Sequence, residues 1–173
     1  PISGQQTLFA SGNLLDGPAG LAFDANGDLY VASLRNNNIV KVDSAGGQSL
    51  FTSGGSISNP SALVFDSAGN LLVASLSTHS IVKVDPQGTQ SVFASSPYLA
   101  FHLGMAFDGS GNLYVTSIPD KAVIKIDSAG NQSFFTPFLG TGMAGPGGLA
   151  FSLPPNTAPK IKAGQDITRQ QGS

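Results

Sequence analysis

Two imidazoles are the side chains of this sequence best suited to acid–base or metal chemistry. His79 and His102 are the only histidines among 173 residues, and the sequence contains no cysteine. A zinc site or a general base would need partner side chains at a fixed spacing, and neither histidine has them. His102 stands before an apolar segment, at the position that Pro18 and Pro60 occupy elsewhere in the chain. We therefore interpret His102 as filling a turn rather than as a catalytic base.

The acidic side chains are spaced for turns rather than for a metal ion. Asp24, Asn26 and Asp28 follow the spacing of calcium-loop ligands, but glycine stands at the fourth place instead of the sixth. An Asx residue followed closely by glycine predicts a tight hairpin turn. The glycines at 54–55 and 145–148 lack the lysine of a phosphate loop. We expect no catalytic residue, no metal and no cofactor.

The chain is built from a repeat of 42 residues. Several residue types return at this spacing, and each returning set has three members. The sets are Phe23, Phe65 and Phe107; Gly27, Gly69 and Gly111; Ser33, Ser75 and Ser117; and Lys41, Lys83 and Lys125. Part of a further copy starts at Gly148, and Phe9 belongs to the end of an earlier copy. A period of this length indicates a repeat architecture.

Each repeat contains four short apolar segments separated by turn residues. In the first copy we predict strands at residues 21–24, 29–33, 39–43 and 48–52, preceded by an orphan strand at 5–10. These strands are apolar on both alternating faces, so each small sheet must be covered on both sides. The predicted fold class is all-β: a β-propeller of four-stranded antiparallel blades. One chain provides an incomplete ring of three full blades and partial ones.

Phenylalanine returns at two places in every repeat. Phe9, Phe51, Phe93 and Phe135 fall in the outermost predicted strand, and Phe23, Phe65, Phe107 and Phe151 fall in the innermost. We predict that these rings pack between blades and form core rather than a ligand cage.

Polar loop residues that differ between copies are the candidates for binding. Loops that join the second to the third strand, and each blade to the next, share one face of such a fold, and loops carry function. The candidate binding residues are Arg35, Asn36, Asn37, Asn38, Thr78, His79, Asp120 and Lys121, with Tyr98 and His102 from the longer connections. We interpret the serines at 33, 75 and 117 as a polar ring where strands meet loops.

The repeats resemble NHL repeats over about residues 2–152. The resemblance rests on three segments: Gly-Pro-Ala-Gly-Leu-Ala-Phe-Asp (17–24), Gly-Asp-Leu-Tyr-Val-Ala (27–32) and Asn-Asn-Asn-Ile-Val-Lys-Val-Asp (36–43). It implies a propeller that usually has six blades. Either the chain is part of a longer propeller, or two copies close one ring, or the tail helps to form a fourth blade. Because open blade edges favour aggregation, we expect association with a second copy or with further blades.

Two groups of enzymes on similar propellers provide a test for catalysis. Streptogramin-lyase-like proteins carry a histidine at the position held here by Ala19, Ser61, Leu103 and Gly147, and an acidic residue near the three serines. Gluconolactonase-like propellers hold their metal partly with glutamate, and this chain has none. These departures favour a non-catalytic protein. The alternative is a streptogramin-lyase-like or gluconolactonase-like enzyme whose site is completed by missing blades.

The sequence pattern changes after residue 152, which divides the chain into propeller blades at 1–152 and a proline-rich linker and tail at 153–173. Within the tail, Asn156-Thr-Ala-Pro159 and Ala163-Gly-Gln-Asp166 resemble the start of a PKD-type, immunoglobulin-like module of bacterial surface proteins. This resemblance implies a secreted or cell-surface protein. The same segment could instead add as a strand to an exposed blade edge.

Composition narrows the range of partners. The net charge is −2 and only 10% of residues are charged, so the chain lacks the basic surface that nucleic acid or an anionic membrane requires. No run approaches the roughly 18–20 apolar residues of a membrane span. We predict a non-catalytic binding or assembly module of an extracellular protein, which contacts protein or glycan through loops or blade edges. A filament or scaffold subunit is a further alternative.

Overall fold

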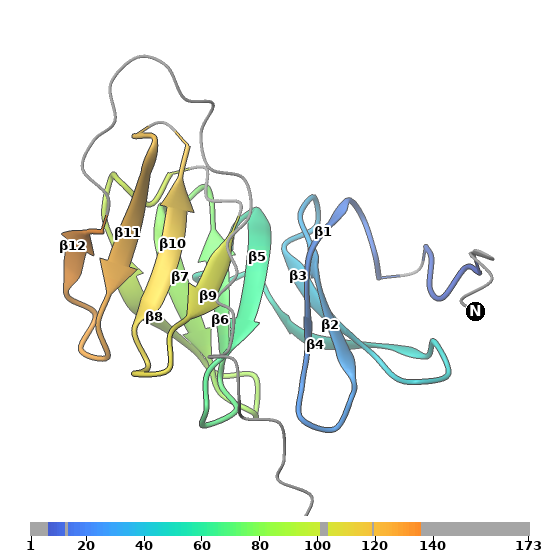
Figure 1. Cartoon of the computed structure of the whole chain (residues 1–173). Coiled ribbons are helices and arrows are strands. Elements are labelled where there is room, and N and C mark those ends of the chain that lie inside the picture. The colour runs from blue at the N-terminus through green and yellow to red at the C-terminus, as the bar shows by residue number, and fades with distance from the viewer. Residues whose placement is uncertain (1–6, 13, 101–103, 119, 136–173) are drawn as a thin grey trace, which may run out of the picture.

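The computed structural model describes residues 7–12, 14–100, 104–118 and 120–135. Their regular structure is entirely β-strand, in three four-stranded antiparallel sheets (Figure 1). Blade 1 contains β1 (Pro18–Phe23), β2 (Leu29–Ser33), β3 (Asn38–Val42) and β4 (Gln48–Ser53). Blade 2 contains β5 (Pro60–Phe65), β6 (Leu71–Ser75), β7 (Ser80–Val84) and β8 (Gln90–Ser95). Blade 3 contains β9 (Met105–Phe107), β10 (Leu113–Ser117), β11 (Ala122–Ile126) and β12 (Gln132–Phe134).

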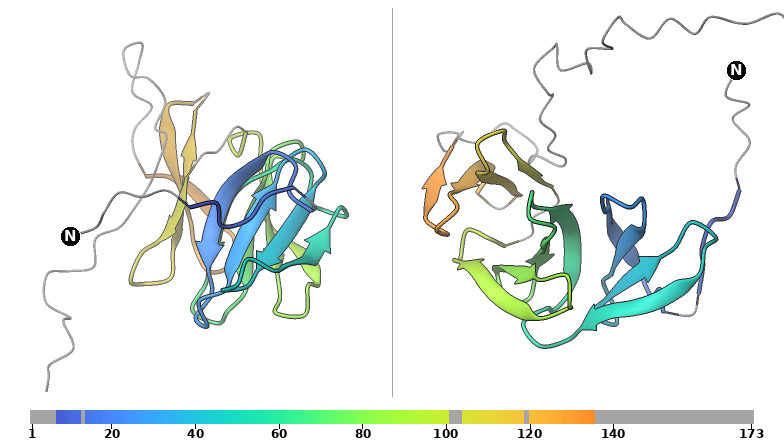
Figure 2. Two further views of the ribbon diagram at one scale, coloured as in Figure 1. Left: turned by 90° about the vertical axis from the view of Figure 1, so that its right-hand side faces the viewer. Right: turned by 90° about the horizontal axis from the view of Figure 1, so that it is seen from below.

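The strands of each sheet follow one another in chain order, from an inner to an outer strand. The inner strands lie next to one another, β1 against β5 and β5 against β9. The three sheets follow one another along an arc (Figure 2). This is the blade arrangement of a β-propeller, so the predicted fold class is confirmed. In the described ranges, no helix is long and apolar enough to cross a membrane.

Aspartate starts the tight turns that join neighbouring strands. Oδ1 of Asp24 accepts hydrogen bonds from the backbone N–H groups of Asn26 and Asp28, both at 2.9 Å. The same pair of hydrogen bonds recurs at Asp43, Asp66, Asp85, Asp108 and Asp127. These carboxylates satisfy the amides of the turn. The predicted hairpin turns are therefore confirmed.

Alternate side chains of one strand face different neighbouring blades. Leu71 and Val73 of β6 belong to the core between blades 1 and 2, whereas Leu72 and Ala74 belong to the core between blades 2 and 3. All four side chains are buried. A sheet covered on both faces needs apolar residues at successive positions. This explains why β6 has no polar residue between Leu71 and Ala74.

The orphan strand predicted at residues 5–10 is wrong in the part that the structure describes. Residues 7–10 are not in a strand. The carbonyl oxygen of Phe9 nevertheless approaches Gly46 as the carbonyl oxygen of Phe51 approaches Gly88. Residues 7–10 therefore follow the path of an outer strand. A strand needs a hydrogen-bonded neighbour, and the described residues provide none at this place.

The face of blade 1 that points away from blade 2 is only partly covered. Three valines, Val31, Val40 and Val42, are buried beneath the segment that precedes β1. Leu21, at the edge of this face, is 60% exposed. Its repeat copy Leu63 is only 7% exposed, because blade 1 packs against Leu63. We refer to this surface as the open face of blade 1.

The prediction for the phenylalanines holds only where two blades meet. Phe51, Phe65, Phe93 and Phe107 pack against the two cores between blades. The prediction is wrong for Phe9, Phe23 and Phe135, which are exposed because each belongs to one end of the row of blades. Phe151 lies outside the described residues.

Alanine variants of two repeat copies can test this difference. Phe65→Ala is expected to lower the free energy of unfolding by roughly 3 kcal/mol, because it removes a packed aromatic ring. The centroid of this ring lies 5.0 Å from that of Tyr30. Phe23→Ala is expected to cost less than about 1 kcal/mol, since its ring is already exposed. Urea unfolding at low protein concentration, where association does not contribute, measures both. Equal losses would contradict the open face.

Candidate binding site

The loops between second and third strands hold one residue of each repeat in a strained backbone conformation. It is the last residue of the loop, directly before the third strand: Asn37 in blade 1, His79 in blade 2 and Lys121 in blade 3, with φ angles of 59°, 48° and 49°. The left-handed region suits glycine and asparagine, and costs other residues roughly 1–2 kcal/mol. Histidine and lysine thus keep a side chain where glycine would be less strained, which is a pattern found at functional positions.

In blade 1, the predicted asparagines are engaged in holding their own loop. Nδ2 of Asn36 donates to the carbonyl oxygen of Leu14 at 3.0 Å. Oδ1 of Asn37 accepts from the backbone N–H of Asn59 at 2.8 Å, and Asn38 is the first residue of β3. These contacts give the asparagines structural roles. They also confirm that this loop and the connection to the next blade lie on one face.

Two of the predicted charged loop residues, Arg35 and Asp120, have weak or local partners. The guanidinium of Arg35 lies 3.7 Å from a carboxylate oxygen of Asp16, and both side chains are mostly exposed. An exposed ion pair at this distance contributes little stability. In blade 3, Oδ2 of Asp120 accepts a hydrogen bond from the hydroxyl of Ser117 at 2.7 Å. Asp120, in the loop, is therefore held by the last residue of β10.

Thr78 of blade 2 and Tyr98 of the following connection are also held locally. Oγ1 of Thr78 lies 2.7 Å from the hydroxyls of both Ser75 and Ser80. The ring of Tyr98 packs edge-on against Phe134 of β12, with 5.1 Å between centroids. Tyr98 therefore lies against the outer strand of blade 3.

The structure does not assemble the candidates into one constellation. Among the described residues, no hydrogen bond or ion pair joins candidates from different blades, and no group of three His, Cys, Asp or Glu side chains could hold a metal ion. The side chains of His79 and Lys121 have no hydrogen bond or ion pair within the described ranges. These two remain the loop side chains most available to a partner. His102 lies outside the described residues.

The buried serines connect strands to the preceding loops. The hydroxyl of Ser33 accepts from the backbone N–H of Asp16 at 2.6 Å, and that of Ser75 accepts from the N–H of Ser58 at 2.8 Å. Both serines are fully buried. They fix the loops that enter blades 1 and 2. In blade 3, the hydroxyl of Thr116 accepts from the N–H of Gly104 at 3.0 Å instead, and Ser117, which is also buried, bonds to Asp120.

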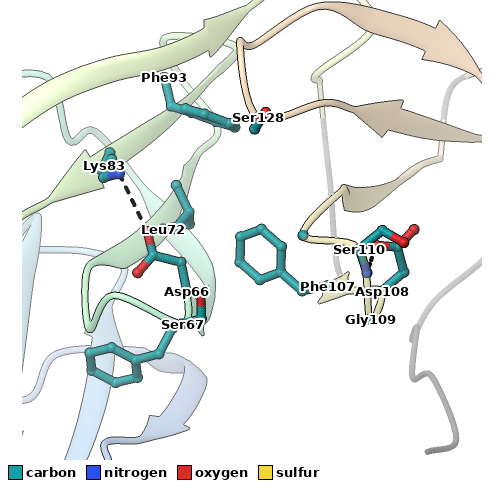
Figure 3. A pocket seen from close by; sticks show the side chains of 12 residues that line it. Asp66, Ser67, Leu72, Lys83, Phe93, Phe107, Asp108, Gly109, Ser110 and Ser128 are labelled. Carbon is teal, nitrogen blue, oxygen red and sulfur yellow. Dashed lines mark hydrogen bonds and ion pairs between the residues drawn. The ribbon is translucent and has the colours of Figure 1, made fainter.

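The opposite face carries two grooves that the loop-based prediction misses. Each lies between neighbouring blades, at the tight turns that follow the inner strands. Their volumes are about 450 Å³ between blades 1 and 2 and about 490 Å³ between blades 2 and 3. We refer to the latter as the turn-face groove; its lining includes Asp66, Leu72, Lys83, Phe93, Phe107 and Asp108 (Figure 3). The sequence signal for it is one repeat position that changes from Tyr30 to Leu72 and back to Tyr114.

An ion pair stands at the edge of the turn-face groove. Nζ of Lys83 lies 3.3 Å from Oδ2 of Asp66. Burial raises the pKa of Asp66, but hydrogen bonds from Asn70 and Lys83 outweigh this and lower it. In blade 1 the corresponding lysine, Lys41, bonds to Asp28 at 2.7 Å, which raises the pKa of Lys41. The groove therefore combines phenylalanine rings with one acceptor and one donor.

Known structures with the same fold include enzymes and a protein complex. A catalytically inactive virginiamycin B lyase from Staphylococcus aureus with quinupristin matches with a TM-score of 0.67 and 19% identity, over 80% of this chain and 46% of that chain. A streptogramin B lyase matches with a TM-score of 0.64 and 18% identity, over 75% and 44%. A chain of a nidogen/laminin complex matches with a TM-score of 0.65 and 22% identity, over 78% and 52%.

These likenesses concern the fold alone, because identities are low and one fold hosts many functions. The chain spans about half the length of these structures. No protein-family model and no curated protein matches it.

The strained loop residue of blade 2 can be tested by substitution. His79→Gly is expected to raise the free energy of unfolding by roughly 0.5–1 kcal/mol, because glycine relieves the positive φ. Gly69→Ala is the matched opposite: its φ is 82° and nothing lies within 4 Å of the added carbon, so only backbone strain changes. This variant is expected to lose about 1 kcal/mol. Denaturant titration measures both; a loss of stability in His79→Gly would show that the imidazole supports the fold.

The turn carboxylate of Asp108 provides a pH test. Hydrogen bonds, above all from the Asn112 side chain, lower the pKa of Asp108 from 3.8 to about 2. Since the folded-state pKa lies below the unfolded value, this carboxylate stabilises the fold above pH 3.8, and the contribution is lost as the pH falls through about 2. Asn112→Ala is expected to raise the pKa of Asp108 in an NMR titration, so that stability is lost at a higher pH. Asn131→Ala, which acts on Asp127 in the other turn, is the control and should leave Asp108 unchanged.

Proposed function

We propose that this chain is a non-catalytic binding and assembly module of NHL-like blades in a secreted or surface protein. The observation that supports this function is the open face of blade 1. Leu21 and Phe23 are exposed there, and the adjoining groove of about 330 Å³ is lined only by apolar residues. An exposed apolar surface of this kind is typical of a protein contact.

The repeat indicates what could cover the open face. Between blades 1 and 2, the ring of Phe65 packs 5.0 Å from that of Tyr30. Blade 3 again has a tyrosine at this position, Tyr114, with its ring 4.9 Å from Phe135 in the same edge-on geometry. Tyr114 is buried but Phe135 is 57% exposed, so Phe23 of a second copy can reach this pair through the ring of Phe135. We propose that two copies associate head to tail, blade 3 of one against blade 1 of the other.

The loop face provides a second contact surface. His79 and Lys121 project from equivalent loops of neighbouring blades, and their strained backbone favours a role beyond turn formation. A protein or glycan partner would meet these side chains first. Likeness to a chain of a nidogen/laminin complex is in keeping with protein contacts.

The C-terminal part of the proposal rests on sequence. Residues 153–173 lie outside the described residues, and we propose that they form a linker followed by the beginning of a PKD-like module or by a strand that adds to a blade edge. Either role fits a larger extracellular or bacterial surface protein. Propeller blades would then occupy residues 1–152.

Sedimentation velocity over a range of protein concentrations tests head-to-tail association. The chain is expected to form a dimer as the concentration rises, because two apolar surfaces are buried together. Phe23→Asp places a charge in that contact and is expected to weaken association at least tenfold, as a buried unpaired charge costs several kcal/mol.

Val92→Asp is the matched control. Val92 is similarly exposed, at 57% compared with 67% for Phe23, but it lies on the outer strand β8 of blade 2. This variant should associate like the unmodified chain. A chain that stays monomeric throughout, or equal weakening by both variants, would contradict association through the open face.

A further inference from the structure

We propose that the turn-face groove between blades 2 and 3 binds a phenol ring, inserted between Phe93 and Phe107. This site is separate from the open face and from the loops, so it is independent of the function proposed above.

The same place one repeat earlier holds a stack of three aromatic rings. There, the ring of Tyr30 lies between Phe51 and Phe65, with both centroids 5.0 Å away and interplanar angles of 88° and 83°. Such edge-to-face contacts are favourable for aromatic rings. Phe93 and Phe107 are the copies of these two phenylalanines, each 42 residues later. The fold thus builds the same pair of aromatic walls twice.

The residue between these two phenylalanines differs from one copy to the next. Blade 1 has Tyr30 and blade 3 has Tyr114, but blade 2 has Leu72. Leucine has no ring, and within the described residues neither Phe93 nor Phe107 is in a ring-to-ring contact. Figure 3 shows the Leu72 side chain between the two phenylalanines. The chain leaves one ring of a three-ring stack to be supplied from outside.

The turn-face groove is large enough for a small molecule and is open to solvent. The groove has a volume of about 490 Å³, which is within the range of sites that take small molecules. Phe93 and Phe107 are only partly buried, so a ligand can reach them from solvent. In the groove between blades 1 and 2, the position between the phenylalanines is already taken by Tyr30.

Asp66 and Lys83 are the polar groups that would meet the hydroxyl group of a bound phenol. In blade 3, the hydroxyl of Tyr114 donates to Oδ2 of Asp108 at 3.2 Å. Asp66 is the copy of this aspartate in blade 2, and Lys83 lies 3.3 Å from it. In blade 1, the corresponding lysine lies 5.5 Å from the ring centroid of Tyr30, which is within cation–π distance. A ring with a hydroxyl group therefore meets an acceptor and a cation in the groove, whereas a plain hydrocarbon ring lacks the hydrogen bond.

The experiment is an NMR titration of the whole chain with p-cresol, the side chain of tyrosine as a free molecule. Saturable shifts are expected for the amides of Asp66, Leu72 and Phe107, and toluene is expected to bind about fivefold more weakly because it cannot donate to Asp66. N-acetyl-tyrosinamide is the second arm. If it also binds, the groove accepts a tyrosine side chain of a peptide; if only p-cresol binds, the groove is restricted to free phenols.

Two variants make the test specific. Leu72→Tyr supplies the ring from the chain itself and is expected to weaken p-cresol binding at least tenfold while preserving the fold. Tyr30→Leu opens the equivalent place between Phe51 and Phe65 and is expected to create a second site for p-cresol. This gain keeps the proposal testable even if Leu72→Tyr fails to fold. Shifts confined to the open face of blade 1, no saturable binding, or unchanged binding in a folded Leu72→Tyr variant would overturn the proposal.

Discussion

Each sheet of this protein has two apolar faces, and a sheet of that kind is stable in water only when other layers cover both. In β6, Leu71 and Val73 face blade 1 while Leu72 and Ala74 face blade 3. The blades must therefore approach closely. At Gly20 in β1, an added side-chain carbon would lie 2.7 Å from the carbonyl oxygen of Ser61 in β5. Burial between blades thus sets the residue types of the strands and the close approach of neighbouring inner strands.

This constraint determines which polar groups are free for function. Oδ1 of each turn aspartate is occupied by backbone amides, and the hydroxyls of Ser33 and Ser75 are occupied by the loops that enter the blades. Groups that are so committed cannot also serve a ligand without loss of stability. The candidates for function are therefore positions whose residue type differs between copies. Two such positions are Asn37, His79 and Lys121 on the loop face, and Tyr30, Leu72 and Tyr114 on the turn face.

The sequence was sufficient for features that depend on neighbours in the chain. The Asx-plus-glycine spacing predicted the turns, and the apolar run at 29–33 gave the bounds of β2. It was insufficient where the answer depends on what lies across a blade boundary. Phe23 and Phe65 stand in similar local sequences, but only Phe65 has a blade against it. The turn-face groove depends on Leu72 and Phe93 of blade 2 together with Phe107 of blade 3, which joins them only once the two blades are in contact.

The open face and the turn-face groove follow from the same packing rule at two scales. At the scale of a blade, a face without a neighbour leaves Leu21 and Phe23 exposed. At the scale of one aromatic side chain, a leucine in place of tyrosine leaves Phe93 and Phe107 without their third aromatic partner. A repeat protein shows such gaps clearly, because its other copies show how each gap is filled: by a blade in one case and by a phenol ring in the other. The filled copies therefore specify the chemistry of the partner more closely than the shape of an isolated cavity would.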